Sequence, residues 1–184
     1  MSVGRIPRAW IYRTVVTATM LKTGALMELA ARAGALAAQA AQASFERTGA
    51  LARFGRRLGL GLQMLDDFGN LAAPAAEAGD SKALEDLRNG RPTWPWARAA
   101  LDLDAAAFED LQAGARTLSE DGDPDGTRAR ALSARLRMAV GLKGRRQATA
   151  YLEAALNDLR VQIGDRDELD LLAAEIERLE VSYG

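Results

Sequence analysis

The sequence predicts a single all-α domain over residues 1–184, on three observations. Ala, Leu, Arg and Glu, which favour helices, dominate the composition. Runs of alternating β-branched residues are missing, and the candidate strand at 15–17 lies inside a helical pattern. Near the C-terminus, apolar residues recur every three or four positions, which places them on one face of each helix. These positions are Leu152, Leu156, Leu159, Ile163, Leu169, Leu172, Ile176 and Leu179.

Breaks in the pattern divide the first part of the chain into two long helices. The pattern favours a first helix over 8–43, with a break near Gly34 as an alternative. Ser44 or Thr48 could cap a second helix that runs to about Leu71, because a hydroxyl oxygen can accept a hydrogen bond from the first helical N–H groups.

A turn at 89–92 marks the middle of the chain. Gly90 tolerates a positive φ, and Pro92 ends the helix that precedes it. Thr93 can cap a helix that starts near Pro95. The remaining segments are expected as loops over 72–79 and 121–126 and as helices over 81–88, 104–120, 127–142, 145–164 and 166–182.

The composition restricts the chemistry. The chain has no cysteine and no histidine, which excludes disulfides, thiolate nucleophiles, histidine catalysis and ordinary zinc sites. Carboxylates without histidine or cysteine suit a hard cation such as Mg²⁺. We see neither an apolar run long enough for a membrane span nor a secretory signal, so the expected location is the cytoplasm.

Charge is distributed unevenly along the chain. Residues 1–64 carry nine Arg and Lys residues and two Glu residues, a net charge of +7, whereas the whole chain has a net charge of −1. Solvated helix faces would produce this pattern. A basic segment that meets an anionic ligand or an acidic partner would also produce it.

The segment from Leu58 to Asp67 is the first candidate site. On a helix, Gln63 shares a face with Asp66 and Asp67. Apolar neighbours raise the cost of ionising two adjacent carboxylates unless a cation is present, which suggests a metal. The alternative is a surface pair at a helix C-terminus, where the helix dipole disfavours anions. Three glycines weaken this helix and are expected where another helix or a ligand approaches closely: Gly55, Gly59 and Gly61.

Two further segments carry candidate phosphate ligands. Lys82 and Arg91 lie on either side of an acidic turn, and both residue types bind phosphate oxygens. The alternative is a loop with solvated charges whose tryptophans, Trp94 and Trp96, pack beneath it. Lys22, followed by a threonine in a helical pattern, is by itself more typical of a solvated lysine.

In this order and spacing, these segments resemble the C-terminal half of the trans-prenyltransferases, the polyprenyl diphosphate synthases. Lys22-Thr23 resembles the Lys-Thr motif of that family, and Gln63-Met-Leu-Asp66-Asp67 resembles its second aspartate-rich helix. The stretch from Lys82 to Pro95 resembles the segment Lys…Asp-Leu…Gly-Lys-x-Thr-x-Pro, with Arg91 in place of the usual lysine. The paired helices ending near Ser182 resemble the C-terminal helices of the family.

The resemblance implies an isoprenoid-synthase-like helical bundle with a central cavity. It implies a transferase of isoprenoid biosynthesis, in which isopentenyl diphosphate attacks the cation formed when an allylic diphosphate ionises. It also implies site residues. Asp66, supported by Asp67, would bind Mg²⁺; Lys22, Lys82 and Arg91 would bind the diphosphate; and Lys22, Thr23 and Gln63 would serve catalysis near the reacting carbons.

Two departures from the family set further expectations. Asn70 stands where the second motif has its last aspartate, which should lower metal affinity. The first aspartate-rich motif and its arginine-rich site have no counterpart before Lys22. We therefore expect a bundle whose N-terminal helices are missing, incomplete alone, in a homo- or hetero-oligomer with a chain that supplies the first motif.

Other functions remain alternatives to catalysis. A non-catalytic regulatory subunit or a helical interaction module of the same family would explain the missing motif, because missing helices expose apolar surface that drives association. Nucleic-acid binding rests only on a small basic patch formed by Arg53, Arg56 and Arg57, with no recognition motif beside it.

Overall fold

A computed structural model describes residues 2–39, 45–72 and 82–182. Within these ranges the chain forms helices and turns and no strand, so the predicted all-α class is confirmed. The α-helices are α1 (Arg8–Thr19), α2 (Ala25–Gln39), α3 (Phe45–Ala72), α4 (Lys82–Arg88), α5 (Trp94–Asp102), α6 (Ala105–Asp121), α7 (Thr127–Leu136), α8 (Leu142–Ile163) and α9 (Asp167–Ser182). Two π-helical turns, η1 (Met20–Gly24) and η2 (Arg137–Gly141), connect α1 to α2 and α7 to α8.

The helix boundaries differ from the predictions at two glycines. The alternative break near Gly34 is wrong, because α2 continues through it. The break predicted between residues 142 and 145 is also wrong, because η2 leads directly into α8. Gly144 lies inside α8, and a Cβ at this position would lie 2.0 Å from the ring of Phe68. This glycine allows close packing and does not end a helix.

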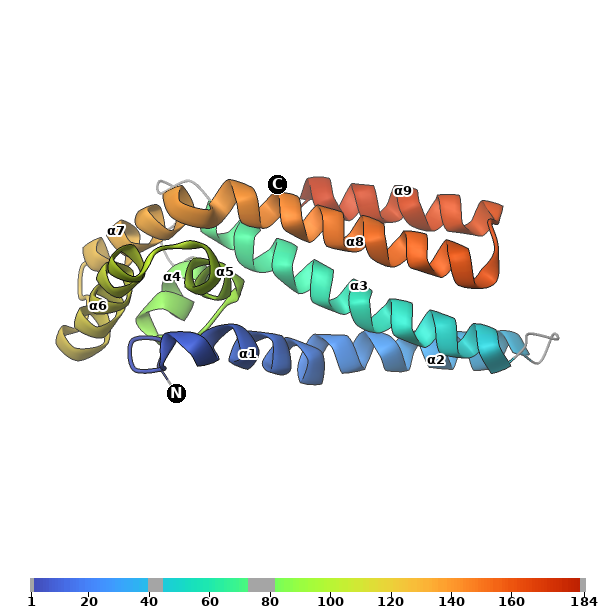
Figure 1. Cartoon of the computed structure of the whole chain (residues 1–184), viewed down its shortest axis with the longest axis horizontal. Coiled ribbons are helices and arrows are strands. Elements are labelled where there is room, and N and C mark those ends of the chain that lie inside the picture. Colours follow the sequence, from blue (N-terminus) through green and yellow to red (C-terminus); the bar gives the residue numbers. More distant parts are fainter. Residues whose placement is uncertain (1, 40–44, 73–81, 183–184) are drawn as a thin grey trace. The chain divides into compact units, whose positions relative to one another are not determined.

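The chain divides into two compact units. One unit comprises Met1–Val16 and Asp66–Arg146, and the other comprises Thr17–Leu65 and Gln147–Gly184. We call them the turn unit, which contains the predicted turn at 89–92, and the bundle unit. Helices α4 to α7 belong to the turn unit, and the long parts of α3, α8 and α9 that run alongside one another belong to the bundle unit (Figure 1).

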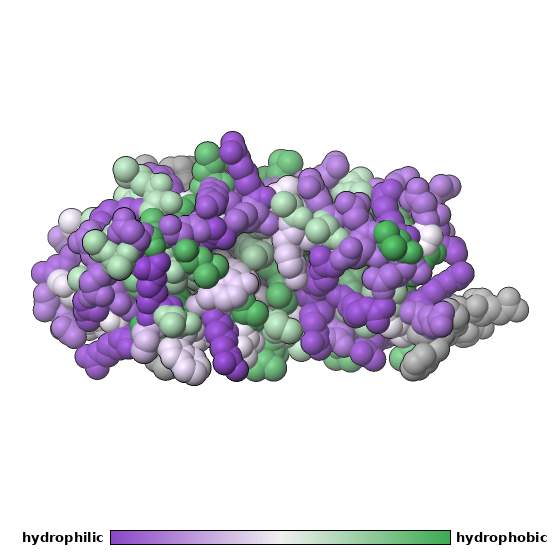
Figure 2. Space-filling view, viewed as in Figure 1, coloured by the Kyte–Doolittle hydropathy of each residue, from purple (hydrophilic) through white to green (hydrophobic). Residues whose placement is uncertain are grey.

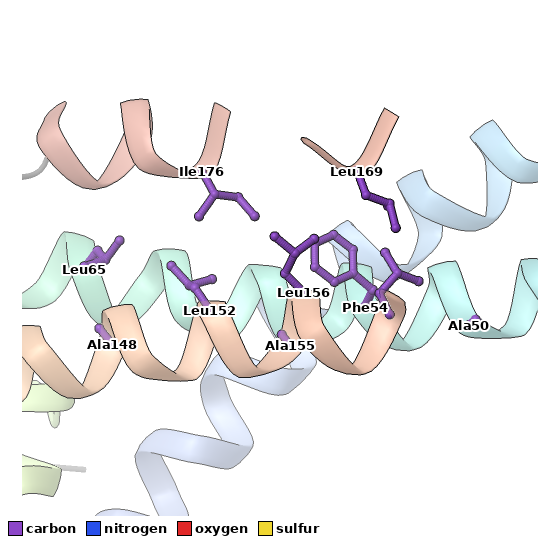
Figure 3. Close-up of a cluster of buried hydrophobic side chains, with 10 residues drawn as sticks. Ala50, Phe54, Leu65, Ala148, Leu152, Ala155, Leu156, Leu169 and Ile176 are labelled. Atoms are coloured by element: carbon purple, nitrogen blue, oxygen red, sulfur yellow. The ribbon is translucent and has the colours of Figure 1, made fainter. Parts of the chain in front are cut away.

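The bundle unit is built on the apolar faces that the sequence predicted. Side chains from α3, α8 and α9 meet in one buried cluster, in which Leu152 is 0% and Leu159 1% exposed (Figure 3). Leu169 and Ile176 from α9 cover it, and Gly61 lets the side chain of Leu152 approach α3. Ile163 and Leu172 pack at the edge of the cluster. The spacing of three and four therefore identified the core of this unit correctly.

The turn unit buries its aromatic residues. Trp96 is 0% and Trp94 5% exposed, so the predicted burial of both tryptophans is confirmed. The guanidinium of Arg8 donates to the carbonyls of Ala100 and Leu103, which lie at the C-terminal end of α5. These contacts satisfy carbonyls that have no partner within the helix and hold α1 against α5.

The surface carries exposed apolar residues among charged ones. Figure 2 shows hydrophobic patches between hydrophilic side chains on the face that it draws. On η1 and α2 of the bundle unit, four leucines have more than half of their surface exposed: Leu21, Leu26, Leu29 and Leu36. None of the helices in the described ranges combines the length and apolar character that crossing a bilayer requires.

Candidate functional site

A small pocket of the turn unit collects two of the predicted site residues, Asp67 and Arg91, with further polar residues. Asp67 and Asn70 reach it from the last turns of α3, Asp86 reaches it from α4, and Arg91 and Thr93 reach it from the turn before α5. Apolar residues complete the lining: Leu71, Leu87, Pro95 and Leu136. The cavity volume is about 20 Å³. Because a cavity needs about 10–15 Å³ to hold one water molecule, this pocket suits a water or a bare cation and is too small for a diphosphate.

The N-terminus of α5 is capped by a residue from another helix. Oδ2 of Asp67 accepts a hydrogen bond from the backbone N–H of Trp94 at 2.9 Å. Thr93 occupies the cap position, but its side chain makes no cap hydrogen bond, so the predicted cap by the Thr93 hydroxyl is wrong. A carboxylate is favourable here because the helix N-terminus carries partial positive charge. Asp67 therefore connects the aspartate pair to the turn that carries Arg91.

Arg91 is held by the helix that precedes it. Its Nη1 lies 2.7 Å from Oδ1 of Asp86, and its backbone N–H donates to the Asp86 carbonyl oxygen at 2.8 Å. The hydrogen bond with Asp86 raises the pKa of Arg91 above its ordinary value. Gly90 has φ of 60°, as predicted, which closes the turn between these partners. The Arg91 side chain stays 56% exposed and accessible to an anion.

In the bundle unit, the structure brings two other predicted residues together. The hydroxyl of Thr23 donates to Oε1 of Gln63 at 3.0 Å, although 40 positions separate them. Thr23 lies on η1, and a single π-helical turn of this kind is frequent at functional sites. Gly59 makes the approach possible, because a Cβ there would lie 2.8 Å from the Thr23 carbonyl oxygen.

The other glycine contacts follow the same pattern. A Cβ at Gly55 would lie 2.6 Å from the carbonyl oxygen of Met27. The expectation that the glycines of this helix mark close approach is therefore confirmed at Gly55, Gly59 and Gly61, and in each case the approaching group belongs to another helix.

The two predicted lysines lie on different elements, η1 and α4. Lys22 lies on η1 with an exposed side chain. Lys82 is the first residue of α4, and its side chain lies outside the described part of the chain. Asp66 is half-buried on α3, directly before Asp67.

Sequence reasoning missed the pocket partner of Arg91. Asp86 was recognised only as part of the Lys…Asp-Leu pattern, although a carboxylate five residues before an arginine, with a glycine between them, is a signal for an ion pair across a turn. Thr93 was predicted as a cap and instead lines the pocket. Asn70, predicted only as a departure from the family pattern, lines the same pocket.

The donor atoms fit Mg²⁺ by their chemistry. Asp66 and Asp67 offer carboxylate oxygens and Asn70 offers an amide oxygen, and hard cations prefer oxygen ligands. Within the described ranges no three acidic residues gather closely enough to enclose a metal. Mg²⁺ does not need such a cage, because it is commonly held by one or two carboxylates, with substrate phosphates and water as the remaining ligands. One oxygen of Asp67 accepts the hydrogen bond from the backbone N–H of Trp94.

The basic patch of the second helix is engaged within the bundle unit. Arg56 pairs with Glu28, Arg57 pairs with Asp158, and Arg53 donates to Gln162. These contacts direct the three guanidinium groups towards side chains of the same unit.

A comparison with known protein families gives a match. A family model described as polyprenyl synthetase matches residues 12–121. This stretch contains Lys22, the Asp66-Asp67 pair and the Arg91 turn. No curated protein and no solved structure matches the chain. The match covers more than half of the chain, and the described helices agree with the predicted isoprenoid-synthase-like fold. The chain belongs to the polyprenyl synthetase family.

Proposed function

We propose that this chain binds an isoprenoid diphosphate with Mg²⁺ and takes part in the condensation of an allylic diphosphate with isopentenyl diphosphate. Family membership supports a prenyltransferase-like function. The observation that carries the finer proposal is the pocket, in which Asp67 and Asn70 of the aspartate-rich helix meet Arg91 of the following turn. Acidic residues for a cation and a basic residue for an anion are what a metal-diphosphate complex requires.

Each residue has a proposed role. Asp66, supported by Asp67, would hold Mg²⁺, which stabilises the negative charge of a leaving diphosphate when bound. Lys22, Lys82 and Arg91 would bind diphosphate oxygens, with Arg91 contributing a bidentate donor pair. The pocket is too small for the diphosphate itself, so the anion would lie at its mouth, where the exposed part of Arg91 is accessible.

Thr23 and Gln63 are proposed to act near the reacting carbons, as the resemblance implies. The Thr23 hydroxyl donates its hydrogen bond to the Gln63 oxygen, which leaves the lone pairs of the Thr23 oxygen to accept or to face positive charge. Oxygen dipoles fixed in this way would stabilise positive charge on an allylic carbon and would cost little reorganisation during the reaction.

Condensation is proposed to need further carboxylates. Residues 1–27 contain no Asp or Glu, so nothing there corresponds to the first aspartate-rich motif of the family. These ligands would come from a partner chain or from further residues of the same protein. The exposed leucines of η1 and α2 support a homo- or hetero-oligomer, because solvent-exposed apolar side chains on one element favour association.

The same leucines favour a second candidate function, a non-catalytic subunit or helical interaction module. The two functions differ in ligand binding. A catalytic chain requires Mg²⁺-dependent binding of an allylic diphosphate, whereas an interaction module requires association alone. Size-exclusion chromatography with and without Mg²⁺ and farnesyl diphosphate separates them, since only the catalytic chain co-elutes with the diphosphate.

A condensation assay tests the proposed function. The purified chain is incubated with Mg²⁺, farnesyl diphosphate and radiolabelled isopentenyl diphosphate. We expect the chain to retain the allylic diphosphate and to form no product alone. Product from the pure chain would contradict the requirement for additional carboxylates, and failure to bind farnesyl diphosphate would contradict the proposed function itself.

A further inference from the structure

The N-terminal segment of the chain lies against the turn that carries Arg91. The backbone N–H of Val3 donates to the carbonyl oxygen of Gly90 at 2.7 Å. Ser2 fills the space beside this glycine, because a Cβ at Gly90 would lie 2.3 Å from the Ser2 hydroxyl oxygen. Since Gly90 also has a positive φ, both its conformation and its surroundings require glycine.

Gln112 of α6 fixes this segment from the other side. Its side chain is only 6% exposed, and Nε2 donates to the carbonyl oxygens of Val3 at 2.9 Å and Ile6 at 2.8 Å. The side chains of Val3 and Ile6 are each 1% exposed. Without Gln112, two carbonyl groups in a buried segment would lose their donor, which is costly in free energy.

These contacts form a continuous path from α6 to Arg91. The Gln112 side chain donates to the Val3 carbonyl, and the Val3 N–H donates to the Gly90 carbonyl. The next backbone N–H, that of Arg91, donates to the carbonyl of Asp86. The peptide between Gly90 and Arg91 is therefore fixed at both its oxygen and its nitrogen. Val3, the partner of the Gly90 carbonyl, does not line the pocket, so the path reaches the site from outside it.

We infer that Gln112 and Val3 are positioning residues for anion binding: through residues 2–6 they fix the turn that directs the Arg91 guanidinium. This inference rests on the proposed function, because it requires Arg91 to bind diphosphate. It assigns a role in the site to a buried glutamine and to a segment at the N-terminal end of the described chain, neither of which is predicted to touch substrate.

The test compares Gln112→Met with Leu118→Ala. Methionine keeps the length of the side chain and removes the donor, whereas Leu118→Ala removes buried packing from the same helix and leaves the path to Gly90 intact. Binding of inorganic diphosphate is measured by calorimetry with Mg²⁺ present, and amide hydrogen exchange is followed at Val3 and Arg91. We expect Gln112→Met to weaken diphosphate binding about fivefold or more and to accelerate exchange at both amides. Leu118→Ala should change neither.

A second pair of variants covers the case in which Gln112→Met does not fold. Val3→Pro removes the N–H that reaches Gly90, and Val3→Ala keeps it, so only the proline variant should weaken diphosphate binding. A folded Gln112→Met or Val3→Pro with wild-type affinity overturns the positioning role and leaves the proposed function standing. If the wild-type chain binds no diphosphate, or if Arg91→Gln leaves its affinity unchanged, the proposed function fails.

Discussion

Asp67 and Trp94 are joined by a hydrogen bond that links two sequence motifs: the Oδ2 atom of the carboxylate accepts from the backbone N–H at 2.9 Å. The aspartate pair lies at the end of α3, and Trp94 begins α5 directly after the Arg91 turn. One carboxylate therefore caps a helix and lines the candidate pocket.

Substitution of Asp67 should separate its capping role from its charge. Asp67→Ala is expected to lower the free energy of unfolding by about 1 kcal/mol, because α5 loses its cap. Asp67→Asn keeps an acceptor oxygen and should cost only a few tenths of that. Urea unfolding measures both variants. Equal losses of unfolding free energy in Asp67→Ala and Asp67→Asn would show that the capping hydrogen bond contributes nothing to stability and that only the charge of Asp67 matters.

Substitution of a closely packed glycine of α3 should change stability in the opposite direction from substitution of a glycine with open space around it. Gly59→Ala places a Cβ 2.8 Å from the Thr23 carbonyl oxygen, so the backbone of η1 must move, and we expect a loss of about 1–3 kcal/mol. Gly34→Ala has no atom within 4 Å of the new Cβ and should gain about 0.5–1 kcal/mol through helix propensity. Thermal or urea unfolding of the two variants gives the comparison. A stabilised Gly59→Ala variant would contradict the close approach of η1 and α3.

The hydrogen bond between Thr23 and Gln63 should contribute measurably to stability. Thr23→Val has nearly the same shape and lacks the hydroxyl donor, so the partly buried Gln63 oxygen loses it. We expect a loss of about 1 kcal/mol in urea unfolding. Thr23→Ser, which keeps the donor, is the matched control and should restore most of the difference. If the serine and valine variants are equally destabilised, the hydroxyl is not the relevant group.

Acid should weaken the ion pair between Asp102 of α5 and Lys143 of α8. Burial opposes ionisation of Asp102, but hydrogen bonds from Arg98 and Lys143 outweigh it and hold the pKa of this carboxyl below its ordinary value of 3.8. The stabilisation is therefore complete above about pH 4 and is lost as the pH falls through the lowered pKa of the folded protein. Unfolding free energies of the wild type and Asp102→Asn should differ most near neutral pH and converge in acid. A difference that is constant from neutral pH to about pH 2 would exclude this linkage.

Much of the helical architecture could be predicted because it depends on local patterns. The apolar spacing in α8 and α9 identified the residues that now form the buried cluster, and Gly90 has the positive φ that its turn required. The glycines of α3 were correctly associated with close approach. These features follow from residue type and period, which a sequence displays directly.

Features that depend on tertiary contacts could not be predicted in this way. Gly144 resembled a helix break, because the ring of Phe68 that packs against it lies far away in sequence. The cap of α5 was assigned to the nearest hydroxyl, that of Thr93, whereas a carboxylate from α3 takes this place. Gln112 has no sequence signal, since its partners are backbone carbonyls more than a hundred residues away. The π-helical turns shift the helical period only locally, and a short window does not detect them.

The binding of farnesyl diphosphate with and without Mg²⁺ tests the central claim most directly, with Asp66→Asn as the variant. Asparagine keeps the size of the side chain and removes the negative charge that strengthens binding of Mg²⁺. The proposed function predicts binding by the wild type that requires Mg²⁺ and that falls at least about tenfold in Asp66→Asn, with unfolding stability unchanged. Binding of equal strength without Mg²⁺, or unaltered in the variant, would contradict a metal-dependent diphosphate site at this aspartate pair.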